Sequence, residues 1–169
     1  MIDTAMDDAV HRLVDENDIR KLVLTFSAAI DLRDAAMFRS AFADRVDLDI
    51  PARASGVITL QGLVEADTYA REVIRLLSGW HATQHVSTNH LAEVAGDAGT
   101  CSCYVHATHF LEPDHPDPWL VVGSRYDLTA IRTAEHGWRI SRFRSTPMWS
   151  RGDRGLWEVI ERRILHGPD

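Results

Sequence analysis

The second half of the chain has the pattern of four consecutive β-strands, and this feature limits the possible folds more than any other. Turn or loop signals separate the segments, such as AGDAG at 95–99 and EPDHPDP at 112–118. Strands that follow one another in this way pair most simply as an antiparallel meander. The four expected strands are 80–94, 100–111, 119–133 and 138–146.

Helical patterns occupy most of the first half. Ile19 and Val23 recur at helical spacing, and Asp34 is a suitable N-cap for the helix that follows it. Two short strands, 46–50 and 57–60, are also expected there. Helices followed by a meander predict an α+β fold, in which a curved sheet covers the helices and leaves a pocket in its hollow. The expected helices are 6–32, 35–43, 62–77 and 152–165.

Composition excludes several classes of protein. The chain has 169 residues, enough for one domain, and 45% of them are hydrophobic. A net charge of -7 argues against a nucleic-acid partner, which needs a basic face. No apolar run has the length of a membrane span, and the first residues, MIDTAMDDAV, lack the features of a secretory signal. We therefore expect no membrane association and a cytoplasmic location.

The stretch HATQHVSTNH is the densest group of titratable residues, but its spacing does not favour a metal site. His81 and His85 share strand parity yet lie roughly 13 Å apart on an extended strand, and His90 has the opposite parity. Cys101 and Cys103 are too close along one strand for a good disulfide, so both are expected as free thiols. No Gly-rich phosphate loop or GxSxG motif is present, and we expect no metal and no cofactor.

Three segments resemble the SnoaL-like branch of the nuclear transport factor 2-like superfamily. They are DENDIRKLVLTFSAAIDLRDAAMFRSAFADRVDLDI, TQHVSTN and GSRYDLTAIRTAEHGWRISRF, which resemble its first helices, central strand and closing hairpin. The resemblance implies a single domain over 1–169 and a cone-shaped α+β barrel with a strongly curved mixed or antiparallel sheet. It also implies a homodimer through the outer sheet face, or a higher homo-oligomer. This fold hosts many reactions and also non-catalytic binders.

Within that branch the chain is most similar to cofactor-free lyases: scytalone dehydratase, bile-acid 7α-dehydratase and hexachlorocyclohexane dehydrochlorinase. The resemblance implies an acid–base dyad of Asp31, on the first helix, and His85, on the central strand. It also implies a second polar group on the next strand, His106, or His109 if the alignment shifts by one residue. Where those enzymes carry tyrosine or lysine on the first helix, this chain has Phe26.

The residues alone do not decide whether Asp31 and His85 form a catalytic dyad. A histidine held by a carboxylate is a good general base near neutral pH, because the carboxylate fixes the tautomer and stabilises the charged ring. A single histidine on a strand is, however, more often a buried structural residue, and an aspartate near a helix end is often exposed. The resemblance favours a position inside the pocket for the side chains of both Asp31 and His85.

Seven residues are expected to line the substrate pocket by this resemblance and by their parity on the strands. Some of them could equally belong to the core, to an exposed outer sheet face or to a subunit interface, as could Arg142, Trp80, Trp119 and Met148. The seven are Phe26, Thr83, Tyr104, Thr108, Phe110, Arg144 and Trp149.

The expected function is therefore a cofactor-independent lyase, such as a dehydratase, that acts on a hydrophobic cyclic small molecule through Asp31 and His85. An isomerase or cyclase that uses the same pocket is the alternative, and so is a non-catalytic small-molecule-binding protein. An epoxide hydrolase would need an Asp–Arg–Asp group, for which Asp127 and the C-terminal arginines supply the residue types.

Overall fold

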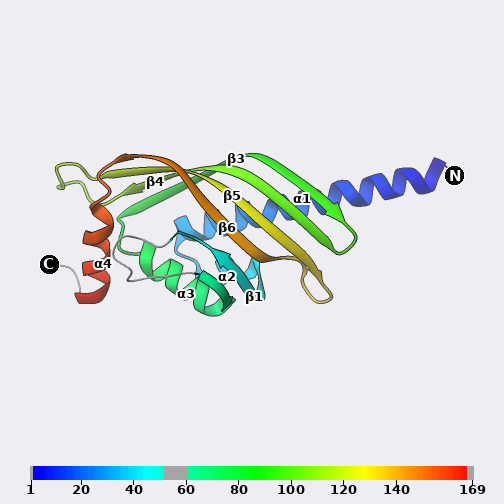
Figure 1. The fold of residues 1–169 in the computed structure, drawn as a ribbon, viewed down its shortest axis with the longest axis horizontal. Helices are drawn as coiled ribbons and strands as arrows, with labels where there is room; N and C mark the ends of the chain where they lie inside the picture. Colours follow the sequence, from blue (N-terminus) through cyan, green and yellow to red (C-terminus); the bar gives the residue numbers. More distant parts are fainter. Residues whose placement is uncertain (1, 52–60, 167–169) are drawn as a thin grey trace.

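The computed structural model describes residues 2–51 and 61–166, in which one long curved sheet arches over the N-terminal helices (Figure 1). The elements in chain order are α1 (Ile2–Leu32), α2 (Ala35–Ser40), β1 (Phe42–Asp49), β2 (Gln61–Glu65), α3 (Ala66–Leu77), β3 (Ala82–Ala95), β4 (Ala98–Phe110), β5 (Trp119–Thr133), β6 (Gly137–Gly152) and α4 (Leu156–His166).

The sheet has six strands in the order β2-β1-β6-β5-β4-β3. Strand β1 pairs with β6 in parallel, whereas β3 to β6 form an antiparallel meander. The strands thus form a mixed, unclosed sheet, and the prediction of an α+β cone with N-terminal helices inside it is confirmed. All four strands of the expected meander are present, and β5 has the predicted bounds.

Alternation along β4 separates the two faces of the sheet. Cys101, Cys103 and Val105 are almost fully buried and lie on the concave face, whereas Tyr104 and His106 are exposed on the outer face. Because residues paired across neighbouring strands share a face, this assignment extends to β3 and β5. The concave face is thus defined by the odd-numbered residues of β4.

Several expected boundaries differ from the structure, and three of the differences have a clear physical reason. The helix predicted over 35–43 ends at Ser40, because Phe42 already begins the alternating buried pattern of β1. The helix predicted over 62–77 begins at Ala66, since the preceding residues pair with β1 as β2. The strand predicted over 138–146 continues to Gly152, which pairs with Leu120 of β5. The strand expected at 57–60 lies outside the described residues.

The side chain of Phe26 lies at the centre of an aromatic cluster between α1, α2 and the sheet. Its ring centroid lies 5.4 to 6.1 Å from those of four other rings. The contacts with Phe38 and Phe143 are edge to face, and contacts of this kind stabilise a core beyond the area they bury. The cluster seats α1 in the hollow of the sheet. Its other members are Phe38, Phe42, Tyr126 and Phe143.

The two cysteines are free, as the sequence predicted, and both are buried. Burial raises the pKa of Cys101 to about 11 and that of Cys103 to about 12. Both side chains therefore remain neutral thiols near neutral pH and contribute small apolar groups to the concave face.

The N-terminal part of α1 projects beyond the sheet (Figure 1). Its side chains are exposed from residue 5 to residue 14, and Met6, Val10 and Leu13 are among them. Across residues 2–51 and 61–166, no helix combines the length and the apolar character needed to cross a membrane.

Asp15 fastens the middle of α1 to the β5–β6 hairpin. Arg132 Nη2 donates a hydrogen bond to Asp15 Oδ2 at 2.6 Å, and Trp138 Nε1 donates one to Asp15 Oδ1 at 3.0 Å. Arg132 also lies 4.5 Å from the centre of the Trp138 ring and donates to Asp97. The hydrogen bonds from Arg132 and Trp138 lower the pKa of the Asp15 carboxyl.

Replacing Asp15 with Asn should lower the free energy of unfolding at pH 7 by about 1–2 kcal/mol, the usual effect of losing charge-assisted hydrogen bonds. Because the folded-state pKa of Asp15 is lowered, its contribution is complete above the ordinary value of 3.8 and disappears as pH falls through the folded value. Urea unfolding of both proteins at several pH values measures the difference. Asp97→Asn is the matched control, since that side chain is 83% exposed and should contribute much less. Equal losses for the two variants would contradict this assignment.

Candidate functional site

The end of α1 and the start of β3 bring Asp31, Thr83 and His85 together. Asp31 Oδ1 lies 2.7 Å from His85 Nδ1 and accepts a hydrogen bond from Thr83 Oγ1 at 2.9 Å. The backbone N–H of His85 donates to Asp31 Oδ2 at 2.7 Å. One carboxylate is thus held by three donors from a single strand, and its orientation is fixed by that strand.

The Asp31 carboxyl is ionised near neutral pH. Burial raises its pKa, but the hydrogen bonds from the ring and backbone of His85, the charge of His85 and the bond from Thr83 together outweigh burial. The net pKa of Asp31 is lowered from its ordinary value of 3.8. Asp31 is therefore a stable carboxylate rather than a proton donor.

This carboxylate determines the tautomer of His85. An ionised carboxylate only accepts hydrogen bonds, so the 2.7 Å contact requires a proton on His85 Nδ1. In the neutral ring the lone pair is then at Nε2, which is the position that can take up a proton. The side chain of His85 is 5% exposed and that of Asp31 is 23% exposed, so the pair is largely shielded from water.

The side chain of His109, on β4, lies beside the Asp31–His85 pair. Thr83 and His109 are paired across the strands, and the ring of His109 lies 5.8 Å from that of His85. His109 Nδ1 donates to the carbonyl oxygen of Leu120 at 3.2 Å, which fixes its tautomer as well.

Two tryptophan rings pack against His109. Trp80, just before β3, and Trp157, on α4, each have a ring centroid 5.0 Å from that of His109. The two indoles also contact each other edge to face. The histidine pair thus has an apolar, aromatic border that limits access of water.

His106, expected as the second catalytic group, lies on the opposite face of the sheet. It is exposed and its ring lies 5.6 Å from that of Trp149. The reason is the alternation of β4, because Cys103, Val105 and Ala107 must point inward. The structure brings His109 to Asp31 and His85, and it does not bring His106 there.

The expected substrate-binding residues are divided among three places. Thr83 lies at the Asp31–His85 pair, and Phe26 belongs to the aromatic core. The other five lie on the outer face, away from the histidine pair. There Phe110 contacts Trp119 and Arg144 donates to Asp49 at 2.6 Å. These five are Tyr104, Thr108, Phe110, Arg144 and Trp149.

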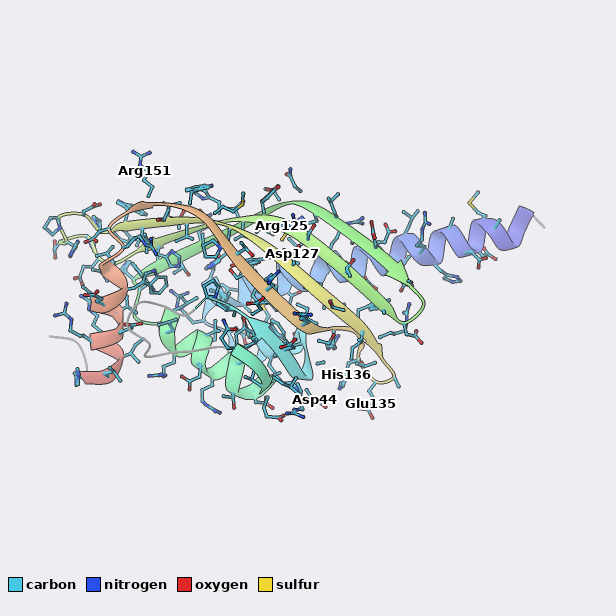
Figure 2. The ribbon with its side chains drawn as sticks, viewed as in Figure 1. Asp44, Arg125, Asp127, Glu135, His136 and Arg151 are labelled. Carbon is cyan, nitrogen blue, oxygen red and sulfur yellow. The ribbon has the colours of Figure 1, made fainter. Side chains whose placement is uncertain are left out.

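The outer face carries a shallow groove of about 330 Å³. Trp149 lies flat across Gly123, where an added Cβ would come within 2.1 Å of its ring. Beside the groove Arg125 donates to Asp127 at 2.8 Å, and both side chains are seen on β5 in Figure 2. The partner of Asp127 on β6 is Arg144, which donates to Asp49 on β1, so this Asp–Arg–Asp set lies on the outer face and does not include Asp31. The groove is lined by Val86, Thr88, Tyr104, Val105, His106, Gly123, Ser124, Met148 and Trp149.

The other histidines of the HATQHVSTNH stretch lie apart from His85. His81 is exposed and packs on Phe110, while His90 Nε2 lies 3.1 Å from the hydroxyl of Ser87. Burial lowers the pKa of His90. Among the residues the structure describes, no three His, Cys, Asp or Glu side chains converge as a metal site.

Sequence reasoning missed Arg33 and Trp157 as neighbours of this site. Arg33 Nη1 donates to Thr83 Oγ1 at 2.7 Å, and Trp157 packs on His109. No local pattern marked either residue. The choice of His109 over His106, by contrast, was visible in the sequence, since the odd-numbered residues of this strand are the more apolar set.

The comparisons with known proteins agree with this fold. The family model of the SnoaL-like domain matches residues 11–144, and no curated protein matches the sequence. The Kfla4162 protein of Kribbella flavida is 23% identical with a TM-score of 0.74, over 85% of this chain and 96% of its own. A candidate scytalone dehydratase of Novosphingobium aromaticivorans is 16% identical with a TM-score of 0.69, over 91% and 93%. The LinA-type3 hexachlorocyclohexane dehydrochlorinase of Novosphingobium barchaimii is 16% identical with a TM-score of 0.64, over 90% and 95%.

Replacing Thr83 with Val should raise the pKa of Asp31, because the valine keeps the shape of the side chain but donates no hydrogen bond to the carboxylate. A pH titration followed by carboxyl ¹³C NMR measures this pKa. Thr108→Val, on the outer face of the neighbouring strand, is the matched control and should leave it unchanged. A Thr83→Val protein with an unchanged Asp31 pKa would contradict the assigned hydrogen bond.

Proposed function

Because the chain belongs to the SnoaL-like family, we propose that it is a cofactor-independent lyase that removes a leaving group from a hydrophobic cyclic small molecule. The observation that carries the proposal is the 2.7 Å hydrogen bond between Asp31 and His85. An ionised aspartate that holds a histidine in one tautomer is the usual arrangement of a general base and the group that orients it.

In the proposed reaction His85 Nε2 removes a proton from a carbon next to an activating group of the substrate. The ring becomes a cation, and Asp31 stabilises it across the hydrogen bond to Nδ1. The electrons of the broken C–H bond form a double bond, and a hydroxide or halide leaves from the adjacent carbon. A hydroxide takes up a proton as it leaves.

His109 is the candidate donor of that proton. Because its Nδ1–H is bonded to the carbonyl oxygen of Leu120, the proton given to the hydroxide is the one that the doubly protonated ring carries on Nε2. Its ring lies 5.8 Å from that of His85, close enough for both to face one substrate. The indoles of Trp80 and Trp157 around it favour a substrate with an apolar ring. The similar structures include that of a hexachlorocyclohexane dehydrochlorinase, which is consistent with an elimination.

The same pair could return its proton to another carbon of the substrate, and the reaction would then be an isomerisation. A non-catalytic binder is the second candidate function, and one observation favours it. Phe26 is 2% exposed in the aromatic core, so the chain has no hydroxyl or amine at the α1 position where the related lyases carry one. Tight binding of cyclic alcohols, ketones or halides without turnover would support the binder.

His85→Ala and Asp31→Asn should each lower kcat by about 100-fold to 10,000-fold, the range expected for loss of a general base or of its orienting carboxylate. The measurement is turnover of a panel of cyclic alcohols and halides, followed by mass spectrometry. His109→Ala should lower kcat as well, and by more than His106→Ala does.

His136→Ala is the control for these variants. His136 is exposed in the turn between β5 and β6, at the end of the sheet opposite α4 (Figure 2). The His136→Ala variant should retain wild-type activity. Full activity of either His85→Ala or Asp31→Asn would exclude the proposed mechanism.

We further propose that two copies associate through the outer face of the sheet and that the protein is cytoplasmic. Exposed apolar side chains gather there around the groove, among them Val86, Tyr104, Met148 and Trp149. An exposed apolar patch of this kind usually marks an interaction site. A second copy would bury it without any further partner.

Trp149→Asp should weaken this dimer at least about tenfold, because a charge at the centre of an apolar interface is left without a partner. Sedimentation equilibrium measures the dissociation constant. Leu24→Asp on α1 is the control, since Leu24 is exposed to a similar extent, 49% against 51% for Trp149. A wild-type protein that stays monomeric at high concentration would exclude the dimer.

A further inference from the structure

Arg33 ends α1 in a conformation that arginine rarely adopts. Its φ is +60°, in the left-handed region. Asp34 N–H donates to Ala29 O at 2.9 Å and Arg33 N–H donates to Ile30 O at 3.2 Å, the hydrogen-bond pattern of a Schellman motif. Glycine normally fills the left-handed position of this motif, because it lacks the Cβ that makes the conformation unfavourable.

The side chain of Arg33 folds back toward the Asp31–His85 pair. Its Nη1 donates one hydrogen bond to Ile30 O at 2.5 Å and another to Thr83 Oγ1 at 2.7 Å. The side chain is partly buried, and burial lowers the pKa of Arg33. The left-handed backbone and the two bonds fix the guanidinium beside Thr83.

This contact determines where the hydroxyl proton of Thr83 points. A guanidinium can only donate, so Thr83 Oγ1 must use a lone pair to accept from Arg33. The one hydroxyl proton is then directed at Asp31 Oδ1, 2.9 Å away, which can only accept. The charge of Arg33 also polarises the hydroxyl and strengthens its bond to Asp31.

We propose that Arg33 is a positioning residue that acts on Asp31 through Thr83, and that it is retained at a left-handed position for this purpose. The chain of contacts runs from Arg33 to Thr83, from Thr83 to Asp31 and from Asp31 to His85. The proposal rests on the proposed roles of Asp31 and His85. A residue that only capped α1 would need the bond to Ile30 O and nothing more.

The test compares Arg33→Gly, Thr83→Val and the double variant by the pKa of Asp31, measured with carboxyl ¹³C NMR. Glycine suits the left-handed backbone, so Arg33→Gly removes the guanidinium without straining the end of the helix. Asn89→Gly is the matched control, because Asn89 is another residue with positive φ, +55°, and is exposed on β3. Arg33→Asn is a second variant, since asparagine tolerates this backbone but is too short to reach Thr83.

We expect Arg33→Gly and Arg33→Asn to raise the pKa of Asp31, and the double variant to raise it by less than the sum of the Arg33→Gly and Thr83→Val effects. Such non-additivity is the signature of two residues that act in series. Asn89→Gly should leave the pKa of Asp31 at the wild-type value. If the chain turns over a substrate, kcat of Arg33→Gly should fall about fivefold to tenfold with little change in KM.

An unchanged Asp31 pKa in Arg33→Gly, or effects that add in the double variant, would overturn the proposal. The titration requires no activity. Failure of the lyase mechanism would show in the turnover of His85→Ala and Asp31→Asn, whereas failure of the Arg33 contact would show in the titration alone.

Discussion

The seating of α1 in the hollow of the sheet is the interaction on which the other features depend. Ile19, Val23 and Phe26 are almost fully buried along one stripe of the helix, and the Phe26 ring contacts four others. With this stripe fixed, the last turn of the helix comes against β3. Asp31 can then meet three donors of that strand, and its carboxylate stays ionised although burial opposes the charge. The polar site is thus positioned by an apolar contact about one and a half turns away along α1.

Most of the fold could be predicted from the sequence because its signals are periodic and repeated. Helical spacing located α1, the turn signals separated the four long strands, and Asp34 does cap α2 by accepting from Met37 N–H. Short elements were less predictable. The residues before Ala66 continue a helical pattern, yet they pair with β1, because a neighbouring strand satisfies their backbone groups. In a segment of only five residues, pairing with a neighbouring strand outweighs the local preference for a helix.

The candidate site shows a different limit of prediction from sequence. Asp31 and His85 were proposed from a resemblance and lie in hydrogen-bond contact, although their catalytic role stays a prediction. The choice of His106 followed the same resemblance, whereas the apolar alternation of Cys101, Cys103 and Val105 pointed to the other face. On β4 the alternation of apolar residues therefore predicted the inward-facing histidine better than the resemblance did. Arg33 and Trp157 could not be predicted, since their positions depend on a rare backbone angle and on the packing of a distant helix.

The bonds of Asp15 have a consequence for the order of folding. Its two partners follow it by 117 and 123 positions, whereas His85 follows Asp31 by only 54. Closing a longer loop costs more chain entropy, and contacts distant in sequence form slowly. The hydrogen bonds of Asp15 therefore cannot form until the β5–β6 hairpin has been synthesised. The C-terminal turn of α1 can meet β3 earlier, because His85 is much closer to Asp31 in the sequence.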